Sequence, residues 1–218
     1  REMRAFHKVR FYRTDMQGVA DSLVFATKDS CLTLYKDPIL WNQNQQLVGE
    51  KVCIYFNDST IERAHIINQA LSVEQIDSTK YNQVSGKEMK SYFRNKQMYK
   101  TEVIGSVRVV YYPMDADSTL IGMNVSETSK LDVYLENQKL EKMVMSPKSS
   151  GTLYPMTQIP AGKDKLDNFV WFDYIRPKNK QDIFNWVPKK VTDQLKKSVR
   201  GPVELPNQHL FEKKKKEE

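Results

Sequence analysis

Few residues of this sequence could carry covalent or acid–base chemistry, and they are far apart in the chain. The histidines are His7, His65 and His209, and the cysteines are Cys31 and Cys53. Nucleophilic catalysis needs a serine or cysteine beside a base, yet the motifs GxSxG, GxxxxGK, HExxH and GxGxxG are all missing. A Cys53–His65 pair is the one candidate, and ordinary strand positions explain both residues more simply. We therefore expect no enzyme activity and no cofactor.

The cysteines and carboxylates also lack the grouping of a metal site. Cys31 and Cys53 are 22 residues apart, with no second cluster of Cys or His, so no metal is expected. Most aspartates fall in predicted turns, where their side chains bond the local backbone. Two buried thiols are the first interpretation of the cysteines, and a disulfide across adjacent strands is the second. The cysteine count therefore does not fix the redox compartment.

The stronger functional signal in the sequence is its set of apolar strand residues. Each apolar strand residue could simply belong to a closed core. Taken together on a sheet folded over itself, such residues could instead form a trough that is open along one side. A trough would hold the acyl chains of a lipid, because each buried methylene contributes roughly 0.8 kcal/mol, and basic residues at its rim would meet a phosphate-bearing head group. The candidate groove residues are Leu23, Phe25, Leu32, Leu34, Trp41, Val52, Ile54, Phe56, Met89 and Phe93.

The elements that must position this row are β-strands. In the stretch from 46 to 67, Val52, Ile54 and Phe56 occupy alternate positions, the period of a strand with two different faces. The tripeptide Asn57-Asp58-Ser59 is typical of a turn, so the stretch predicts a β-hairpin. Similar patterns predict eleven to twelve strands before about residue 146. The fold class is therefore all-β.

A glycine recurs ahead of the β-rich stretches. Gly18, Gly49, Gly86 and Gly122 are separated by 31, 37 and 36 residues. A period of this length favours stacked hairpin repeats, in which each unit buries its apolar face against its neighbours. The alternative is a sandwich without repeats whose hairpins look alike by chance.

Composition agrees with an extended β array. Hydrophobic residues make up 39% of the 218 residues, and no stretch approaches the roughly 20 apolar residues of a membrane-spanning helix. The net charge is +7, of which residues 161–200 contribute +5 and residues 1–160 only +2. The chain begins at Arg1 rather than Met, so we expect a processed or trimmed product, with any signal peptide upstream.

The sequence predicts a different organisation after residue 146. Residues 1–146 form the β-repeat domain, and 147–162 are rich in Pro, Gly and Ser and predict an irregular linker. Residues 163–201 form a small aromatic and basic element of mixed or helical structure. It would contain a short helix from Lys180 to Trp186, and a second that starts at Pro188 and ends near Val199. Residues 202–218 are expected to be a disordered Lys/Glu tail.

Three stretches resemble a known family. VRFYRTDMQGVADSLVF, LTLYKDPILW and QLVGEKVCIYFNDSTIERA are similar to the OstA-like (LptA-like) repeats of bacterial lipopolysaccharide-transport proteins. The residues from Gly18 to Phe25 and from Gly49 to Phe56 match the family frame of glycine, alternating apolar strand and polar turn. Lys36-Asp37-Pro38 departs from it, because the family has Gly-Asn there. The resemblance covers about residues 4–146.

The resemblance implies a twisted, V-shaped β-jelly roll without catalysis. Family members accept lipid A acyl chains inside and stack end to end through exposed edge strands, which bridges the two membranes across the periplasm. The partners implied are thus lipopolysaccharide, other jelly-roll proteins of the transport machinery and further copies of the chain. The aromatic and basic element after residue 163 is an addition that could cover the last edge strand.

Three functions follow as hypotheses. The first is a periplasmic carrier or bridge for lipopolysaccharide, and the second is a non-catalytic β scaffold that binds protein partners through edge strands. Nucleic-acid binding is the third, prompted by the basic C-terminal element. It is disfavoured because the β body is nearly neutral and contains no recognised module.

Overall fold

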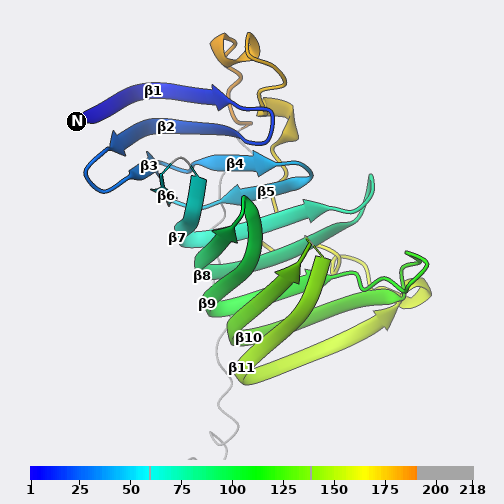
Figure 1. Ribbon diagram of the computed structural model, residues 1–218. Coiled ribbons are helices and arrows are strands. Elements are labelled where there is room, and N and C mark those ends of the chain that lie inside the picture. The colour runs from blue at the N-terminus through cyan, green and yellow to red at the C-terminus, as the bar shows by residue number, and fades with distance from the viewer. Residues whose placement is uncertain (59, 138, 191–218) are drawn as a thin grey trace, which may run out of the picture.

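The computed structural model describes residues 1–58, 60–137 and 139–190 and confirms the all-β prediction. The strands of this part form one antiparallel sheet of eleven strands (Figure 1). They are β1 (Glu2–Tyr12), β2 (Gln17–Ala26), β3 (Cys31–Tyr35), β4 (Ile39–Asn42), β5 (Gln45–Val48), β6 (Lys51–Asn57), β7 (Thr60–Gln75), β8 (Tyr81–Arg94), β9 (Gln97–Tyr111), β10 (Gly122–Glu136) and β11 (Lys139–Pro155). Three short 3-10 turns follow, η1 (Met156–Gln158), η2 (Asp173–Ile175) and η3 (Asp182–Phe184). None of the described helices is long and apolar enough to cross a bilayer.

The hairpin predicted in the stretch from 46 to 67 forms. β6 pairs with the first half of β7, with Cys53 opposite His65 and Ile54 opposite Ala64. The second half of β7 pairs instead with β5. From β7 to β11 each long strand then pairs with the next along its length. β7 therefore connects the region of the sheet that contains β6 with the region that contains β5.

The strands bend along one line, and the sheet folds over itself there (Figure 1). Pairing registers shift between Ile67 and Ala70, between Ser85 and Glu88, and between Thr128 and Lys130. Such bulges bend a strand and increase its twist. Left-handed backbone at the shifts, including Asn68, Gln69, Gly105 and Ser106, accompanies the bends. The short strands break at the same line, after β3 and after β5.

The bend line divides the sheet into two half-sheets. The bare half-sheet contains β3, β6 and residues 2–6, 22–26, 60–67, 88–94, 97–104, 130–136 and 139–146. The covered half-sheet contains β4, β5 and residues 9–12, 17–20, 70–75, 81–85, 107–111, 122–128 and 149–155. The sides of the two half-sheets that face each other enclose an inner core. It includes Leu34 and Val52 from the bare half-sheet and Leu40 and Val109 from the covered half-sheet.

The covered half-sheet is apolar on both faces. In β4, Leu40 belongs to the inner core while its neighbours Ile39 and Trp41 point to the other side. That second side forms an outer core with the strap, our name for residues 156–190. The strap crosses the sheet from the end of β11 to β1, the yellow to orange trace in Figure 1. Leu166, Val170, Phe172 and Ile175 are its buried contribution.

Glutamine side chains attach the strap to the sheet. Gln46 Nε2 donates to the Val170 carbonyl at 2.8 Å, and its Oε1 accepts from the Phe172 N–H at 2.7 Å. Gln83 repeats this pattern with the Asp164 carbonyl and the Leu166 N–H, at 2.7 and 2.9 Å. Each amide thus pairs with two strap backbone groups as a neighbouring strand would, which satisfies buried polar atoms that would otherwise be costly.

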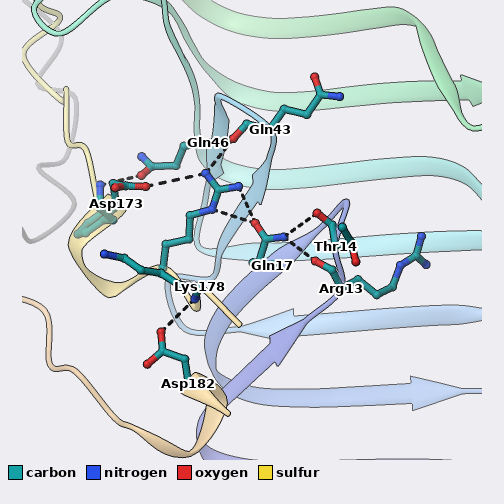
Figure 2. Close-up of polar contacts among 10 residues, drawn as sticks. Arg13, Thr14, Gln17, Gln43, Gln46, Asp173, Lys178 and Asp182 are labelled. Carbon is teal, nitrogen blue, oxygen red and sulfur yellow. Dashed lines mark hydrogen bonds and ion pairs between the residues drawn. The ribbon is translucent and has the colours of Figure 1, made fainter. Parts of the chain in front are cut away.

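Gln17 makes the third attachment through a side chain rather than the backbone. Its Oε1 accepts from Arg176 Nε and Nη2 at 2.8 and 2.6 Å, and its Nε2 donates to the Arg13 carbonyl (Figure 2). Gln17, Gln46 and Gln83 lie on one cross-strand row with Trp41 and Val73. The row therefore fixes the path of the strap.

Several predictions for the C-terminal part are wrong. Residues 147–155 form the end of β11 rather than a linker; Pro147 is tolerated because it lies in a register shift of an edge strand, where no ladder pair forms. Within Lys180–Trp186 the helix is limited to the single 3-10 turn of η3, and the Asn179 side chain accepts the Gln181 and Asp182 N–H groups at its start. The strap also leaves the β11 edge uncovered.

Two of the recurrent glycines lie at the bend line and two do not. Gly49 separates β5 from β6, and Gly86 lies in the β8 register shift. Gly18 lies within β2, where a β-carbon would be 2.3 Å from the Phe11 ring, and Gly122 begins β10. The regularly spaced glycines therefore do not occupy equivalent positions in the structure. The helix predicted from Pro188 lies largely in 191–199, and the tail at 202–218; these residues are outside the described part.

We expect Gln46→Ala to lower the free energy of unfolding by about 2–3 kcal/mol, because a buried carbonyl and a buried N–H lose their partner. Gln45→Ala is the matched control, since the half-buried Gln45 side chain gives one hydrogen bond to Ser72 and should cost under about 1 kcal/mol. Urea denaturation measures both. Equal effects would contradict a special role for Gln46 in holding the strap.

Candidate functional site

The inner face of the bare half-sheet carries an apolar row at right angles to the strands. Directly paired positions on successive strands make up the first row: Leu23, Leu34, Val52, Ile66, Met89, Val103, Leu131 and Met145. Cross-strand neighbours of this kind stabilise a sheet. Leu34, Val52 and Val103 are completely buried against the covered half-sheet. The first row is therefore closed core, and the predicted trough is not open along its whole length.

A second row lies one step nearer the hairpin tips. It consists of Phe25, Leu32, Ile54, Ala64, Ser91, Thr101, Val133 and Met143. Ser91 and Thr101 are buried and their hydroxyls bond each other at 3.0 Å, so neither is left unpaired in the apolar interior. Phe56 and Phe93 follow at the tips, near Ile61 and Met98.

Nine of the ten predicted groove residues therefore come from the bare half-sheet. Trp41 is the exception, because its side chain belongs to the outer core beneath the strap and is 1% exposed. The prediction placed it with the others because Ile39, Leu40 and Trp41 are all apolar. That continuous run in fact reflects burial on both faces of β4.

A pocket opens where the two half-sheets separate toward the hairpin tips. Its volume is about 270 Å³, just below the roughly 300–1,000 Å³ of typical small-molecule pockets. Its apolar lining includes Leu40, Leu47, Ile54, Ile61, Ala64 and Phe93. A second pocket of about 70 Å³ shares Ile61 and Phe93 with it. Of the predicted groove residues, Trp41, Ile54 and Phe93 line the larger pocket and Phe93 also lines the smaller one.

Polar and charged residues surround the mouth. Asp15, Asn42 and Lys96 border both pockets, and Arg13 borders the smaller one. The guanidinium of Arg13 is hydrogen-bonded to Asp15 at 2.5 Å and lowers the pKa of that carboxyl, with a smaller contribution from Lys96. Lys96 is fixed at the tip of the β8–β9 hairpin, in a left-handed turn that it shares with Asn95. The charged residues that line the two pockets are thus two cations, Arg13 and Lys96, and two anions, Asp15 and Glu74.

Sequence reasoning missed the half of the pocket that comes from the covered half-sheet and the turns. Leu40 and Leu47 were not singled out because a pattern along one strand does not show which half-sheet faces which. The turn Asn95-Lys96 was recognised only as a turn. Its position between two strands that carry Phe93 and Met98 was the available signal for a basic residue at the mouth.

The inner apolar surface continues to the β11 edge. Met143 and Met145 of the bare half-sheet are only half-buried, and Leu153 on the covered side is 54% exposed. β11 pairs with β10 alone among the described strands. This edge therefore offers unpaired backbone groups beside an apolar strip, the combination that favours strand addition.

Within the described residues, the cysteines and histidines with the potential for nucleophilic or metal chemistry have separate neighbours. Cys53 lies opposite His65 in the β6–β7 ladder, but the Cys53 sulfur has Thr33 as its hydrogen-bond neighbour, and His65 Nε2 lies 3.1 Å from Glu88. Both cysteines are free, and burial raises the pKa of the Cys31 thiol. Within residues 1–58, 60–137 and 139–190, no three His, Cys, Asp or Glu side chains are placed to hold a metal ion.

Comparison with known proteins gives one structural similarity to report. No family model matches the sequence, and no curated protein matches it. The fold is similar to the crystal structure of LptH, the LptA-homologous periplasmic component of the lipopolysaccharide transport device of Pseudomonas aeruginosa. The match has 14% identity and a TM-score of 0.45, and covers 61% of this chain and 95% of LptH. At these values the likeness assigns no function.

Substitution of two buried alanines distinguishes the pocket from the closed core. Ala64→Leu adds carbon atoms where the pocket leaves space, so we expect the free energy of unfolding to change by less than about 1 kcal/mol. Ala70→Leu is the control, because Ala70 is fully buried in the inner core and does not line the pocket. Overpacking there should cost about 1–3 kcal/mol. Denaturant unfolding measures both, and an equal loss would mean that the pocket is not available space.

Proposed function

We propose that this chain binds acyl chains of lipopolysaccharide between its half-sheets and carries or bridges the lipid across the periplasm to the outer membrane. The observation that supports the proposal is the apolar pocket at the open side of the folded sheet, with cations at its mouth. The folded sheet would be the jelly roll of the OstA-like family, which the sequence stretches around Gly18 and Gly49 resemble.

The pocket suits an alkyl chain better than a polar ligand. Its apolar lining includes Leu47, Ile54 and Phe93, and each methylene that packs against such side chains would contribute roughly 0.8 kcal/mol. At about 270 Å³ it accommodates part of a lipid A, and further chains require the half-sheets to separate. Separation would occur at the hairpin tips, because the first row is closed at the bend line and the second row leads to the pocket.

The mouth suits a phosphate. Lys96 is exposed at the hairpin tip, and Arg13 is more than half exposed despite its ion pair with Asp15. A head-group phosphate above the pocket would bring its negative charge between these two cations, and charge-assisted hydrogen bonds to phosphate are stronger than neutral ones. The Asp15 carboxylate would then share Arg13 with the ligand.

The β11 edge supports the bridging part of the proposal. A second copy of the chain, or another jelly-roll protein of the transport machinery, would add a strand to β11 and extend the apolar strip of Met143, Met145 and Leu153. The alternative function uses this edge alone: a non-catalytic scaffold that binds protein partners through β11. The exposure of Leu153 favours either use, and only the first requires lipid in the pocket.

A pair of adjacent residues tests lipid binding. Phe93 lines the pocket, and its neighbour Tyr92 points to the outer face, where its hydroxyl bonds Glu102. A photocrosslinking amino acid at position 93 should capture lipopolysaccharide in cells, and the same group at position 92 should not. Mass spectrometry of the purified adduct identifies the lipid. Ala64→Leu should reduce capture about tenfold, because it removes the space of about two methylenes. Capture from position 92 alone would contradict the proposal and leave the scaffold function.

The partner edge has its own test. Leu153→Asp should weaken self-association, or association with a jelly-roll partner, by roughly tenfold, because a charge on an edge strand opposes strand addition. Ile121→Asp is the control, since Ile121 is also 54% exposed and lies in the loop before β10. Analytical ultracentrifugation over a concentration series measures both variants. If Ile121→Asp weakens association as much as Leu153→Asp, the β11 edge is not the interface.

A further inference from the structure

The end of the strap presents aromatic side chains to solvent. Phe184 in η3 is 84% exposed, and Trp186 two residues later is 38% exposed. Phe6 on the neighbouring edge strand β1 is 60% exposed. Single exposed apolar residues are ordinary, but three exposed aromatic or large apolar side chains at one end of the molecule are typical of an interaction surface. Figure 1 shows η3 (orange) beyond β1, at the end of the molecule farthest from β11.

The segment that carries Phe184 and Trp186 is basic. Residues 174–190 contain five lysines and arginines and one acidic residue, Asp182. Lys178, Lys180 and Lys190 are exposed, and Lys8 Nζ lies 5.8 Å from the centroid of the Trp186 ring. The Asp182 carboxylate accepts the Lys178 N–H at 3.0 Å (Figure 2) and so is already engaged within the turn. The surface therefore has an excess of positive charge.

Arg10 beneath η3 lacks partners for most of its donors. Its side chain is 2% exposed, and its nearest carboxylate oxygen, on Asp182, is 4.0 Å away. Within the described residues, Nε and Nη1 of this guanidinium have no hydrogen-bond partner. Buried donors normally have one, and a guanidinium matches the geometry of a phosphate. An anion that reached this place would supply the missing acceptor.

We propose that this end of the molecule, defined by Phe6, Lys8, Arg10, Phe184 and Trp186, binds the surface of an anionic phospholipid bilayer. Trp186 and Phe184 enter the interfacial layer, where aromatic side chains are favoured. The surrounding lysines are attracted to the negative surface, at short range and in a salt-dependent way. A lipid phosphate drawn toward η3 is attracted by the positive charge of Arg10 beneath it. The proposal goes beyond lipid transport, since it concerns a membrane as docking partner and not the content of the pocket.

A bilayer fits this surface better than a protein groove does. Phe184 stands free of neighbours rather than in a recess, and the exposed lysines lie on the same short segment as the aromatic residues. A short segment with aromatic and basic residues is the composition of interfacial anchors. The one-sided charge excess also complements an anionic surface, for which no specific partner side chains are needed.

Flotation of the full chain with vesicles tests the proposal. We expect binding to vesicles of phosphatidylcholine with phosphatidylglycerol, little binding to phosphatidylcholine alone, and release at high salt. Phe184→Ser with Trp186→Ala should weaken binding about tenfold or more, because two apolar side chains no longer enter the interface. Met114→Ala is the matched control, since Met114 is exposed in the loop between β9 and β10. Arg10→Met should reduce the preference for phosphatidylglycerol about fivefold.

Brominated lipids identify the residue that enters the bilayer. The chain has three tryptophans, and Trp41 and Trp171 belong to the outer core, so only Trp186 should be quenched. Trp186→Phe should abolish the quenching and retain most of the binding. Salt-sensitive binding without quenching would overturn the proposal, because it would assign adsorption to basic residues elsewhere, such as Lys213–Lys216. Equal binding to both vesicle types, or none, would also overturn it. Ala64→Leu should leave vesicle binding unchanged, which separates this test from that of the pocket.

Discussion

The structure depends on the covering of a half-sheet that is apolar on both faces. An antiparallel sheet can face water on one side, but residues such as Ile39, Leu40 and Trp41 leave β4 without a polar face. The bare half-sheet covers one side because the strands bend over it. None of the described strands covers the other side, and the strap fills that place with Phe172 and its neighbours. The bend and the strap therefore each bury one of the two apolar faces of the covered half-sheet.

The glutamine row provides hydrogen-bond partners for the backbone of the strap. An extended chain on a sheet face presents backbone N–H and C=O groups to an apolar surface, where unpaired groups are costly. A hydrophobic side chain at position 46 or 83 would bury more apolar area but leave these groups without partners. The amides of Gln46 and Gln83 provide one donor and one acceptor each, at the spacing of alternate residues of an extended chain. This arrangement explains why fully buried glutamines lie in the middle of an apolar face.

The sequence predicted what depends on neighbouring residues along a strand. The alternation of Val52, Ile54 and Phe56 correctly identified β6 and its inner face, because period two is a local property of a strand. The sequence did not show how the strands bend, since Gly49 and Gly86 mark bends and Gly18 and Gly122 do not. The path of the strap was also not predictable. Gln17, Gln46 and Gln83 have no local signature, and their partners on the strap are more than 80 residues away.

The path of the strap has a consequence for synthesis of the chain. The outer core joins β2, β4 and β5, made early, to Phe172 and Ile175, made after the last strand, and Gln17 meets Arg176 across 159 positions. Contacts so distant in sequence form slowly, because a long loop must close first. Until the ribosome has released the residues near 176, Val19, Ile39 and Trp41 have no cover. A nascent chain stalled at the end of β11 would therefore expose a wide hydrophobic surface. Chaperones bind surfaces of this kind, and without chaperones such chains aggregate.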